Sequence, residues 1–473
     1  MAPPPAGVHA DAATLAGVRE QDSTSPDGVR VALTGWGHTS ASVCDLEPVS
    51  SEAEVSRLVH SAGRRGVLAR GLGRSYGDAA QNGGGRVLDM TGRRGVLGFD
   101  PATGVVDVEA GVSIDQLIRE FLPRGWFVPV TPGTRQATVG GAIAADVHGK
   151  NHHTHGSFGD HVEALTLVTA DGQPHRLTPT DPLFWATVGG MGLTGVIVRA
   201  SVRLTPVETS TVLVETWRCP DLDSVMAAMA DDDKYEYSVA WIDSLAKGAH
   251  LGRSVLTRGR FATRAELPAR QRPEPLAFSA RTLVTAPPGV PSGLLNQVTV
   301  AAFNEVWYRK APRHREDEPQ SVNTFFHPLD GVAEWNRIYG RRGLLQYQVL
   351  VPLEASETIR EIAEAFSSHG LASFLSVLKR MGPGNPGMLS FPGPGWTLAI
   401  DVPAGDPEVG QLLDRLDESV VAVGGRSYFA KDARMRPATA HAMYPRLAEW
   451  NAIRQDVDPD GLFISDLARR LQL

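Results

Sequence analysis

The stretch PGTRQATVGGAIAADVHGKNHHTHGSFG, residues 132–159, carries six glycines among mostly small residues. Glycine permits positive φ and lets a backbone come close to a ligand. Such a segment leaves amide groups free to form a concave site for a phosphate, although a tight turn in a packed core is an alternative. A second glycine-rich loop, ARGLGRSYGDAAQNGGG at 69–85, follows a short apolar segment. The two loops together predict one extended diphosphate ligand that is held from two sides.

Composition is typical of a soluble globular protein. The chain has 473 residues, 42% of them hydrophobic and 21% charged, and a formal net charge of -7. This length predicts two or three domains, and the absence of a long basic run argues against nucleic-acid binding. Cys44 and Cys219 cannot form a disulfide framework. We expect no signal peptide, because the N-terminus lacks a basic and an apolar region, and no apolar run is long enough for a transmembrane segment.

Hydrophobic periodicity predicts an α+β pattern of short strands and helices. Residues 1–30 are rich in Pro, Ala, Asp and Ser, which predicts a disordered tail, with ordered sequence beginning at Leu33. One helix is expected after a capping box of Ser51 and Glu54, and another after Ser113. The expected strands are residues 67–69, 86–90, 105–110, 126–130 and 196–204.

The string GMGLTG at 190–195 matches the glycine pattern of a dinucleotide-binding turn. That turn must be followed by a helix whose N-terminus faces the pyrophosphate. Residues 196–204, VIVRASVRL, are β-branched and predict a strand instead. We therefore reject a Rossmann fold, and neither glycine loop ends as a P-loop does.

Composition shifts after Pro206, and two later strands each place polar residues on one face. LQYQV at 345–349 does so with Gln346 and Gln348, and WTLAID at 396–401 with Thr397, Ala399 and Asp401. Because side chains alternate along a strand, this sheet presents a polar face either to a ligand or to solvent.

Four histidines, His148, His152, His153 and His155, suggest a metal site. Neighbouring histidines on a glycine-flanked loop point in different directions, and a zinc site needs spaced ligands. We expect no metal and assign His148 to the ligand pocket. Later, GGRSYFAKD at 424–432 brings Tyr428 and Lys431 after a double glycine. Lys431 is either an ordinary surface lysine or a cation beside a cofactor.

Long strings resemble the decaprenylphosphoryl-β-D-ribose 2-oxidase family, which belongs to the vanillyl-alcohol-oxidase-type flavoenzymes. The resemblance spans about Leu33 to Leu471. It rests on LTGWG, the two glycine loops, LFWATVGG, VWYRK (306–310), FHPLD (326–330), LQYQ, LSFP, AKD and HAMYPR. It implies an α+β, two-domain PCMH-type FAD-binding fold with an inserted substrate domain built on an antiparallel sheet. The implied boundaries are 31–207 and 425–473 for the FAD-binding domain and 208–424 for the substrate-binding domain.

The resemblance also implies the site residues. FAD, bound non-covalently, would contact Arg70, Gly71, Leu72, Gly73, Arg74, Ser75, Tyr76, Gly77, Asp78, Ala79, Gly133, Thr138, Val139, Gly140, Gly141, Ala145, Asp146, Val147, His148, Ile197 and Tyr428. The substrate pocket would include Tyr76, Lys150, Gln346, Gln348, Lys379, Thr397, Ala399 and Asp401. Lys431 would be the essential lysine, with Tyr428 and His148 beside it.

The implied reaction is FAD-dependent oxidation of the ribose 2-hydroxyl of the prenylphosphoryl-ribose lipid to a keto product, the first step of epimerisation to the arabinose donor for cell-wall arabinan. Lys431 would handle the hydroxyl proton. An NAD(P)H-dependent short-chain reductase would take the product as partner. A soluble FAD-dependent sugar or aldonolactone oxidase of the same fold and a non-catalytic flavin-binding scaffold are the alternatives.

Two residues depart from the family pattern. Ala399 stands where the best-known members carry a cysteine that nitroaromatic inhibitors trap, so the resemblance implies resistance to that trapping. Phe326 replaces a tyrosine, which implies one hydroxyl fewer near the pocket wall.

The family's lipid substrate implies a peripheral contact with the plasma membrane. The sequence favours its cytoplasmic side, and the resemblance leaves the periplasmic side open. Residues 276–300 combine many apolar residues with several prolines and one charge, Arg281. Because prolines exclude a long regular helix, we expect a mobile lid without secondary structure over the pocket mouth, where it meets the lipid tail. A loop packed on its own domain is the alternative.

Overall fold

The computed structural model describes residues 28–230, 234–280, 282 and 284–473. Most of the expected N-terminal tail lies outside these residues. Ordered sequence begins slightly earlier than predicted, because strand β1 (Val29–Thr34) already precedes Leu33.

The first sheet carries the first glycine loop. Its order is β1-β2-β4-β3, with β2 (Ala41–Pro48), β3 (Val67–Arg70) and β4 (Arg86–Asp89). Helix α1 (Glu52–His60) connects β2 to β3 and begins at Ser51, whose hydroxyl accepts from the Glu54 amide as predicted. The Glu54 carboxylate accepts from Ser50, and a backbone hydrogen bond from Ser51 also contributes to lowering its pKa.

The second sheet is antiparallel and has the order β5-β6-β10-β8-β9. Its strands are β5 (Val96–Asp100), β6 (Val105–Glu109), β8 (Val162–Val168), β9 (Pro174–Leu177) and β10 (Val196–Arg203). The associated helices are α2 (Ile114–Phe121), α3 (Val139–Ala144), α4 (His152–His155) and α5 (Pro182–Thr187). A strand, not a helix, follows the glycines at 190–195, which confirms the rejection of a Rossmann turn.

The strand predicted at 126–130 is too long. Only β7 (Trp126–Phe127) forms, and it pairs with β11 (Thr205–Pro206). Pro129 and Pro132 follow it closely, and proline cannot donate to a strand ladder.

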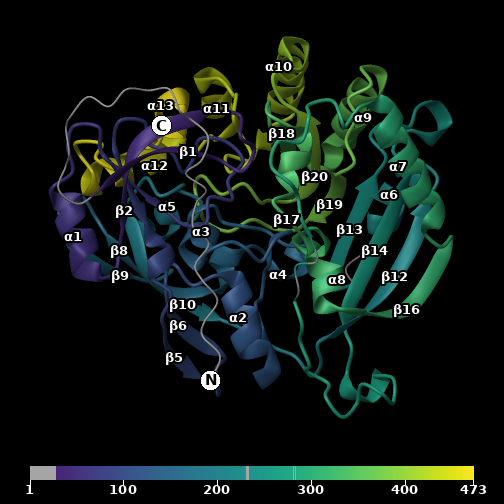
Figure 1. Cartoon of the computed structure of the whole chain (residues 1–473), viewed down its shortest axis with the longest axis horizontal. Coiled ribbons are helices and arrows are strands. Elements are labelled where there is room, and N and C mark those ends of the chain that lie inside the picture. The colour runs from purple at the N-terminus through teal and green to yellow at the C-terminus, as the bar shows by residue number, and fades with distance from the viewer. Residues whose placement is uncertain (1–27, 231–233, 281, 283) are drawn as a thin grey trace.

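The third sheet has eight strands in the order β16-β12-β14-β13-β19-β20-β18-β21. Their bounds are β12 (Thr211–Cys219), β13 (Tyr237–Ile242), β14 (Ser254–Phe261), β16 (His314–Ser321), β18 (Leu344–Val351), β19 (Ser376–Met381), β20 (Gly395–Pro403) and β21 (Arg426–Ser427). Its helices are α6 (Leu222–Ala230), α7 (Gln297–Lys310), α8 (Val322–Phe326), α9 (Ser356–Ser368) and α10 (Pro407–Ala422). Figure 1 shows this sheet beside the part of the molecule that carries the two smaller sheets.

The end of the chain returns to the first sheet. Helices α11 (Pro437–Met443), α12 (Leu447–Val457) and α13 (Asp466–Leu471) lie with the N-terminal elements in Figure 1. Asp466 accepts from the Gly83 amide at 2.9 Å, and Arg470 donates to Asp78 at 2.7 Å. The C-terminal segment therefore fixes the far end of the first glycine loop.

The segment 276–300 was expected to lack secondary structure, and this expectation is wrong. Strand β15 (Val284–Thr285) pairs with β17 (Val332–Ala333), and the last residues belong to α7. Leu276 and Phe278 pack against a buried cluster, whereas Arg281 and Leu283 lie outside the described residues. None of the described helices combines the length and the apolar character needed to cross a bilayer.

Candidate active site

Three adjacent strands of the large sheet present polar residues on one face. The directly opposed pairs are Gln346 and Asp401, Gln348 and Ala399, and Thr397 and Lys379. The prediction that Gln346 shares a face with Gln348, and Thr397 with Ala399 and Asp401, is confirmed. Ala399 is buried, so this face is not an ordinary solvent-exposed surface.

His148 brings the glycine-rich stretch against this face. Its Nδ1 lies 2.9 Å from Nζ of Lys379, and its Nε2 lies 2.9 Å from the side-chain amide of Gln348. Burial, together with neighbouring cations, lowers the pKa of His148 well below its usual value, so the ring is neutral. Lys379 and the Gln348 amide therefore hold the neutral ring from its two nitrogens.

Lys431 lies on the other side of the same group of residues. Its Nζ is 3.9 Å from the centre of the Tyr76 ring, a cation–π contact, and the Tyr76 hydroxyl lies 3.3 Å from the Gln346 amide. Burial lowers the pKa of Lys431 to about 8, although the charge of Asp401 acts in the opposite direction. A lysine with this pKa has a substantial neutral fraction near neutral pH, which a proton acceptor requires.

Asp401 has one oxygen that the protein leaves unpaired. Oδ1 accepts from Gln346, whereas Oδ2 is buried without a hydrogen-bond partner. Burial raises the pKa of Asp401 to about 7. The buried hydroxyl of Tyr339 also has no partner, and Asp401 contributes to raising its pKa. Because buried polar groups are nearly always paired, these two atoms indicate a place for a polar ligand group or a water.

Tyr428 is held rigidly next to His148. Its hydroxyl donates to the Ala145 carbonyl at 2.7 Å, and its ring stacks on Phe391 with 4.8 Å between the centroids. The His148 ring lies 5.7 Å from both of these rings. Tyr428 therefore forms a wall of the site, with its proton already engaged.

The first glycine loop fits the diphosphate of FAD. The amides of residues 72–75 donate to no acceptor among the described residues, and the loop is partly accessible. Gly73 has φ +63, a value that turns successive amides toward one point. Consecutive free amides of this kind form an anion-binding concavity.

The second glycine loop does not supply the same donors. The amides of Val139 and Gly140 donate to Val112 and Ala110, both at 2.8 Å, and the amide of Gly141 donates to the Thr138 hydroxyl. The expectation of diphosphate donors from both loops is therefore wrong for these three amides. A Cβ at position 140 would lie 3.0 Å from that of Ala110, so this glycine serves close packing. At Gly133 an added Cβ would meet nothing within 4 Å.

Several residues expected at FAD have internal partners. Arg70 donates to the carbonyls of Thr34 and Ala80, and Asp78 pairs with Arg470. Asp146 accepts from Ser157 and from the Gly159 amide. Ile197 belongs to a buried cluster. These side chains therefore hold the loops in place through contacts within the protein.

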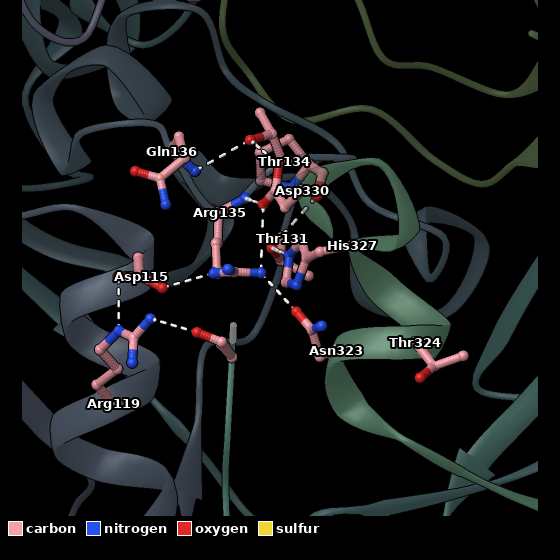
Figure 2. Close-up of polar contacts among 12 residues, drawn as sticks. Asp115, Arg119, Thr131, Thr134, Arg135, Gln136, Asn323, Thr324, His327 and Asp330 are labelled. Atoms are coloured by element: carbon pink, nitrogen blue, oxygen red, sulfur yellow. Dashed lines mark hydrogen bonds and ion pairs between the residues drawn. The ribbon is translucent and has the colours of Figure 1, made fainter. Parts of the chain in front are cut away.

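Arg135 and His327 join the start of the second glycine loop to the segment around α8 (Figure 2). The sequence analysis assigned these two residues no role. The Arg135 guanidinium contacts Asp115 at 2.6 Å and also bonds Asn323. His327 lies 2.7 Å from the Thr131 hydroxyl. Asp330 accepts from Thr134 and from the Arg135 amide. The strings PGTRQ and FHPLD are therefore two sides of one clamp, a pairing that only the folded chain shows.

Lys150 and Phe326 do not join the network around His148. Lys150 donates to the Phe325 carbonyl, and its Nζ lies 4.2 Å from the Phe325 ring centre. Phe326 is 2% exposed and packs on Phe127 and Tyr237. The missing hydroxyl at position 326 therefore belongs to an aromatic core and not to the pocket wall.

The remaining histidines of the stretch point to different partners. His152 accepts from the Gly382 amide at 3.2 Å, and His153 lies 2.9 Å from the Tyr235 carbonyl. Within the described ranges, the group spaced to hold a metal ion is Glu215, His314 and Glu316. It lies at the edge of the large sheet, where His314 already pairs with Glu215.

Comparisons with known proteins agree with an FAD site. Residues 48–178 match a family described as FAD binding domain, and residues 399–471 match the family of D-arabinono-1,4-lactone oxidase. The chain is 49% identical to a decaprenylphosphoryl-beta-D-ribose oxidase of Mycolicibacterium smegmatis, over 93% of this chain and 97% of that protein. It is 25% identical to an alditol oxidase of a Streptomyces species, over 93% and 99% of the two chains. It is 32% identical to an L-gulono-1,4-lactone dehydrogenase of Mycobacterium tuberculosis, over 34% and 37%.

Proposed function

Because the chain belongs to the decaprenylphosphoryl-β-D-ribose oxidase family of FAD-dependent oxidoreductases, we propose that it oxidises the ribose 2-hydroxyl of decaprenylphosphoryl-β-D-ribose to a ketone. The observation that carries this proposal is 49% identity across nearly the full length of both chains. The ketone is the intermediate from which epimerisation yields the arabinose donor for cell-wall arabinan.

Oxidation of a secondary alcohol removes a hydride from carbon and a proton from oxygen. FAD, when bound, supplies the two-electron acceptor for the hydride. Lys431 takes the hydroxyl proton in its neutral form, which a pKa of about 8 makes accessible. Asp401 lies within electrostatic reach of Lys431, and Gln346 orients its carboxylate.

The charges around the site suit an anionic lipid phosphate. The charges of Lys431 and Lys150 both act on Lys379, and burial lowers the pKa of both Lys379 and Lys150 to about 7. The charge of Asp401 acts on Lys431 and raises its pKa. A phosphodiester beside Lys379 and Lys150 would favour the charged forms of these two lysines, so binding would draw protons from solution.

Anaerobic mixing with a prenylphosphoryl ribose tests the proposal. We expect the flavin absorbance near its visible maximum to bleach in a single turnover, with one ketone formed per flavin. A prenylphosphoryl 2-deoxyribose is the matched control, because it lacks the reacting hydroxyl and should leave the flavin oxidised. Bleaching by free alditols or aldonolactones but not by the prenyl-linked sugar would contradict the proposal.

That outcome would favour the second candidate, a soluble FAD-dependent oxidase of sugars or aldonolactones. The match of residues 399–471 to the lactone-oxidase family and the full-length similarity to an alditol oxidase support it. A flavin-binding scaffold without catalysis would bleach with none of these compounds. The unpaired Oδ2 of Asp401 and the lowered pKa of Lys431 argue against a scaffold.

The FAD should be held without a covalent bond. Both His148 nitrogens have partners inside the protein, so this histidine has no free nitrogen for a tether. Acid precipitation should therefore release the yellow colour into the supernatant. Flavin that remains in the pellet and maps to a His148 peptide would contradict this prediction.

The wider setting of the reaction follows from the same proposal. The keto product would pass to a separate NAD(P)H-dependent short-chain reductase. The enzyme would act at the plasma membrane as a peripheral protein, with residues 31–207 and 425–473 as the FAD-binding domain and 208–424 as the substrate-binding domain. Residues 284–296, which precede α7, would cover the pocket mouth.

A further inference from the structure

Helix α7 turns apolar side chains toward solvent. Val298 is 79% exposed and Val306 is 66% exposed, and Phe303 and Trp307 are exposed as well. On a helix, residues four apart lie on one face, so Val298, Ala302 and Val306 form one row, and Phe303 and Trp307 form the next. Two adjacent rows of exposed apolar side chains on one helix face make this face a candidate interaction surface.

The opposite face fixes the orientation of this helix. Val300 and Asn304 are buried, and the Asn304 amide donates to Asp243 at 2.7 Å. The Tyr308 hydroxyl donates to the Cys219 carbonyl at 3.2 Å. The outward direction of the apolar rows is therefore built into the fold and is not a consequence of a loosely attached helix.

A line of aromatic rings connects this face to the active site. Trp307 stacks on Phe303 at 6.0 Å, and Phe303 lies 6.0 Å from Phe374. Phe374 lies 5.9 Å from Tyr339, whose cluster includes Tyr76, the ring beneath Lys431. The exposed surface and the reacting lysine are thus two ends of one apolar layer.

We propose that the outward face of α7 docks on the surface of a lipid bilayer. The proposal rests on the proposed function, because a bilayer is where a prenyl-linked substrate resides. Trp307 and Phe303 suit the interfacial region, and Arg309 and Lys310 follow them for contact with lipid phosphates, as in interfacial helices. The single acid of the helix, Glu305, is already paired with Arg253 at 2.7 Å and with Arg309.

The size of the surface favours a bilayer over a second protein. A helix of 14 residues is about 21 Å long and about 10 Å wide, and so offers roughly 200 Å². A stable protein interface buries about 800 Å² on each partner. In Figure 1, α7 flanks the large sheet on the side away from the first two sheets, so a bilayer could approach it freely.

Sedimentation of the FAD-loaded full chain with vesicles of phosphatidylcholine and phosphatidylglycerol tests the proposal. The variant Val298→Ser, Val306→Ser, Trp307→Ser should bind these vesicles at least about tenfold more weakly, because it removes three apolar side chains that would leave water on docking. The matched control is Val29→Ser, Val43→Ser, Leu97→Ser, which removes exposed apolar residues from strands far from α7. It should bind as the unmodified chain does.

Unchanged vesicle binding in the α7 variant, or equal loss in the control, would overturn the proposal. Loss of a dimer in size-exclusion chromatography, with vesicle binding unchanged, would instead identify a second copy as the occupant. Vesicle binding is measured without substrate, so its result does not depend on whether the protein catalyses the proposed reaction. Turnover of a short-tailed analogue should be the same in all three proteins, and its absence in all of them would count against the proposed function alone.

Discussion

Replacing Lys431 with alanine should lower the rate of flavin reduction by prenylphosphoryl ribose about 10²–10⁴-fold, the usual contribution of a general base. The variant should still fold and retain FAD. The neighbouring residues Tyr76 and Gln346 are hydrogen-bonded to each other, so their contact does not depend on the lysine. The loop whose amides are candidate donors to the FAD diphosphate ends before Tyr76. The measurement is single-turnover anaerobic bleaching, with the flavin-to-protein ratio as the test of integrity.

Two controls separate proton transfer from charge. Lys431→Arg keeps a cation that does not lose its proton in proteins, so it should be as slow as the alanine variant. Added methylamine should partly restore Lys431→Ala, because a small neutral amine can enter the space and accept the proton. An alanine variant within a few-fold of the unmodified enzyme would contradict a role for Lys431 in proton transfer. Full activity of the arginine variant would mean that charge alone suffices.

The fold class and the cofactor could be predicted from sequence. The α+β class, the vanillyl-alcohol-oxidase-type FAD-binding fold and the FAD cofactor are confirmed by the matched families. Local rules succeeded where the determining contacts are local. Ser113 caps its helix as expected, and alternation correctly placed Gln346 with Gln348 on one face of β18, and Thr397 with Ala399 and Asp401 on one face of β20.

The rest depends on contacts between distant parts of the chain. The clamp of Arg135 joins residues separated by 188 and 195 positions, and neither string alone reveals its partner. The amides of Val139 and Gly140 lie in a glycine-rich stretch that predicts free donors for a phosphate. In the folded chain they donate to carbonyls on the segment from Ala110 to Val112, so they are not available to a ligand. Helix α7 was not expected, because the prolines before it suggested irregular structure, whereas Asn296 caps a regular helix immediately after them.

Asp401→Asn should move the acid limb of the pH profile for flavin reduction to lower pH by about one unit, the lower end of the effect of a nearby opposite charge. The Asp401 carboxylate raises the pKa of Lys431 against the larger lowering by burial. Asparagine has nearly the same shape and still accepts from Gln346, but it carries no charge, so the pKa of Lys431 falls below its present value of about 8. The neutral amine is then available at lower pH, and the rate at acidic pH rises relative to the plateau.

Tyr339→Phe is the matched control for this shift. It removes the unpaired hydroxyl of Tyr339, which Asp401 influences, without changing the charge, so its pH profile should keep the original acid limb. The direction of movement decides the role of Lys431. If the charged ammonium were the active form, a lower pKa in Asp401→Asn would move the alkaline limb and reduce activity above neutral pH. Movement of the acid limb alone means that the enzyme uses the amine, and that the Asp401 carboxylate sets the pH at which this amine becomes available.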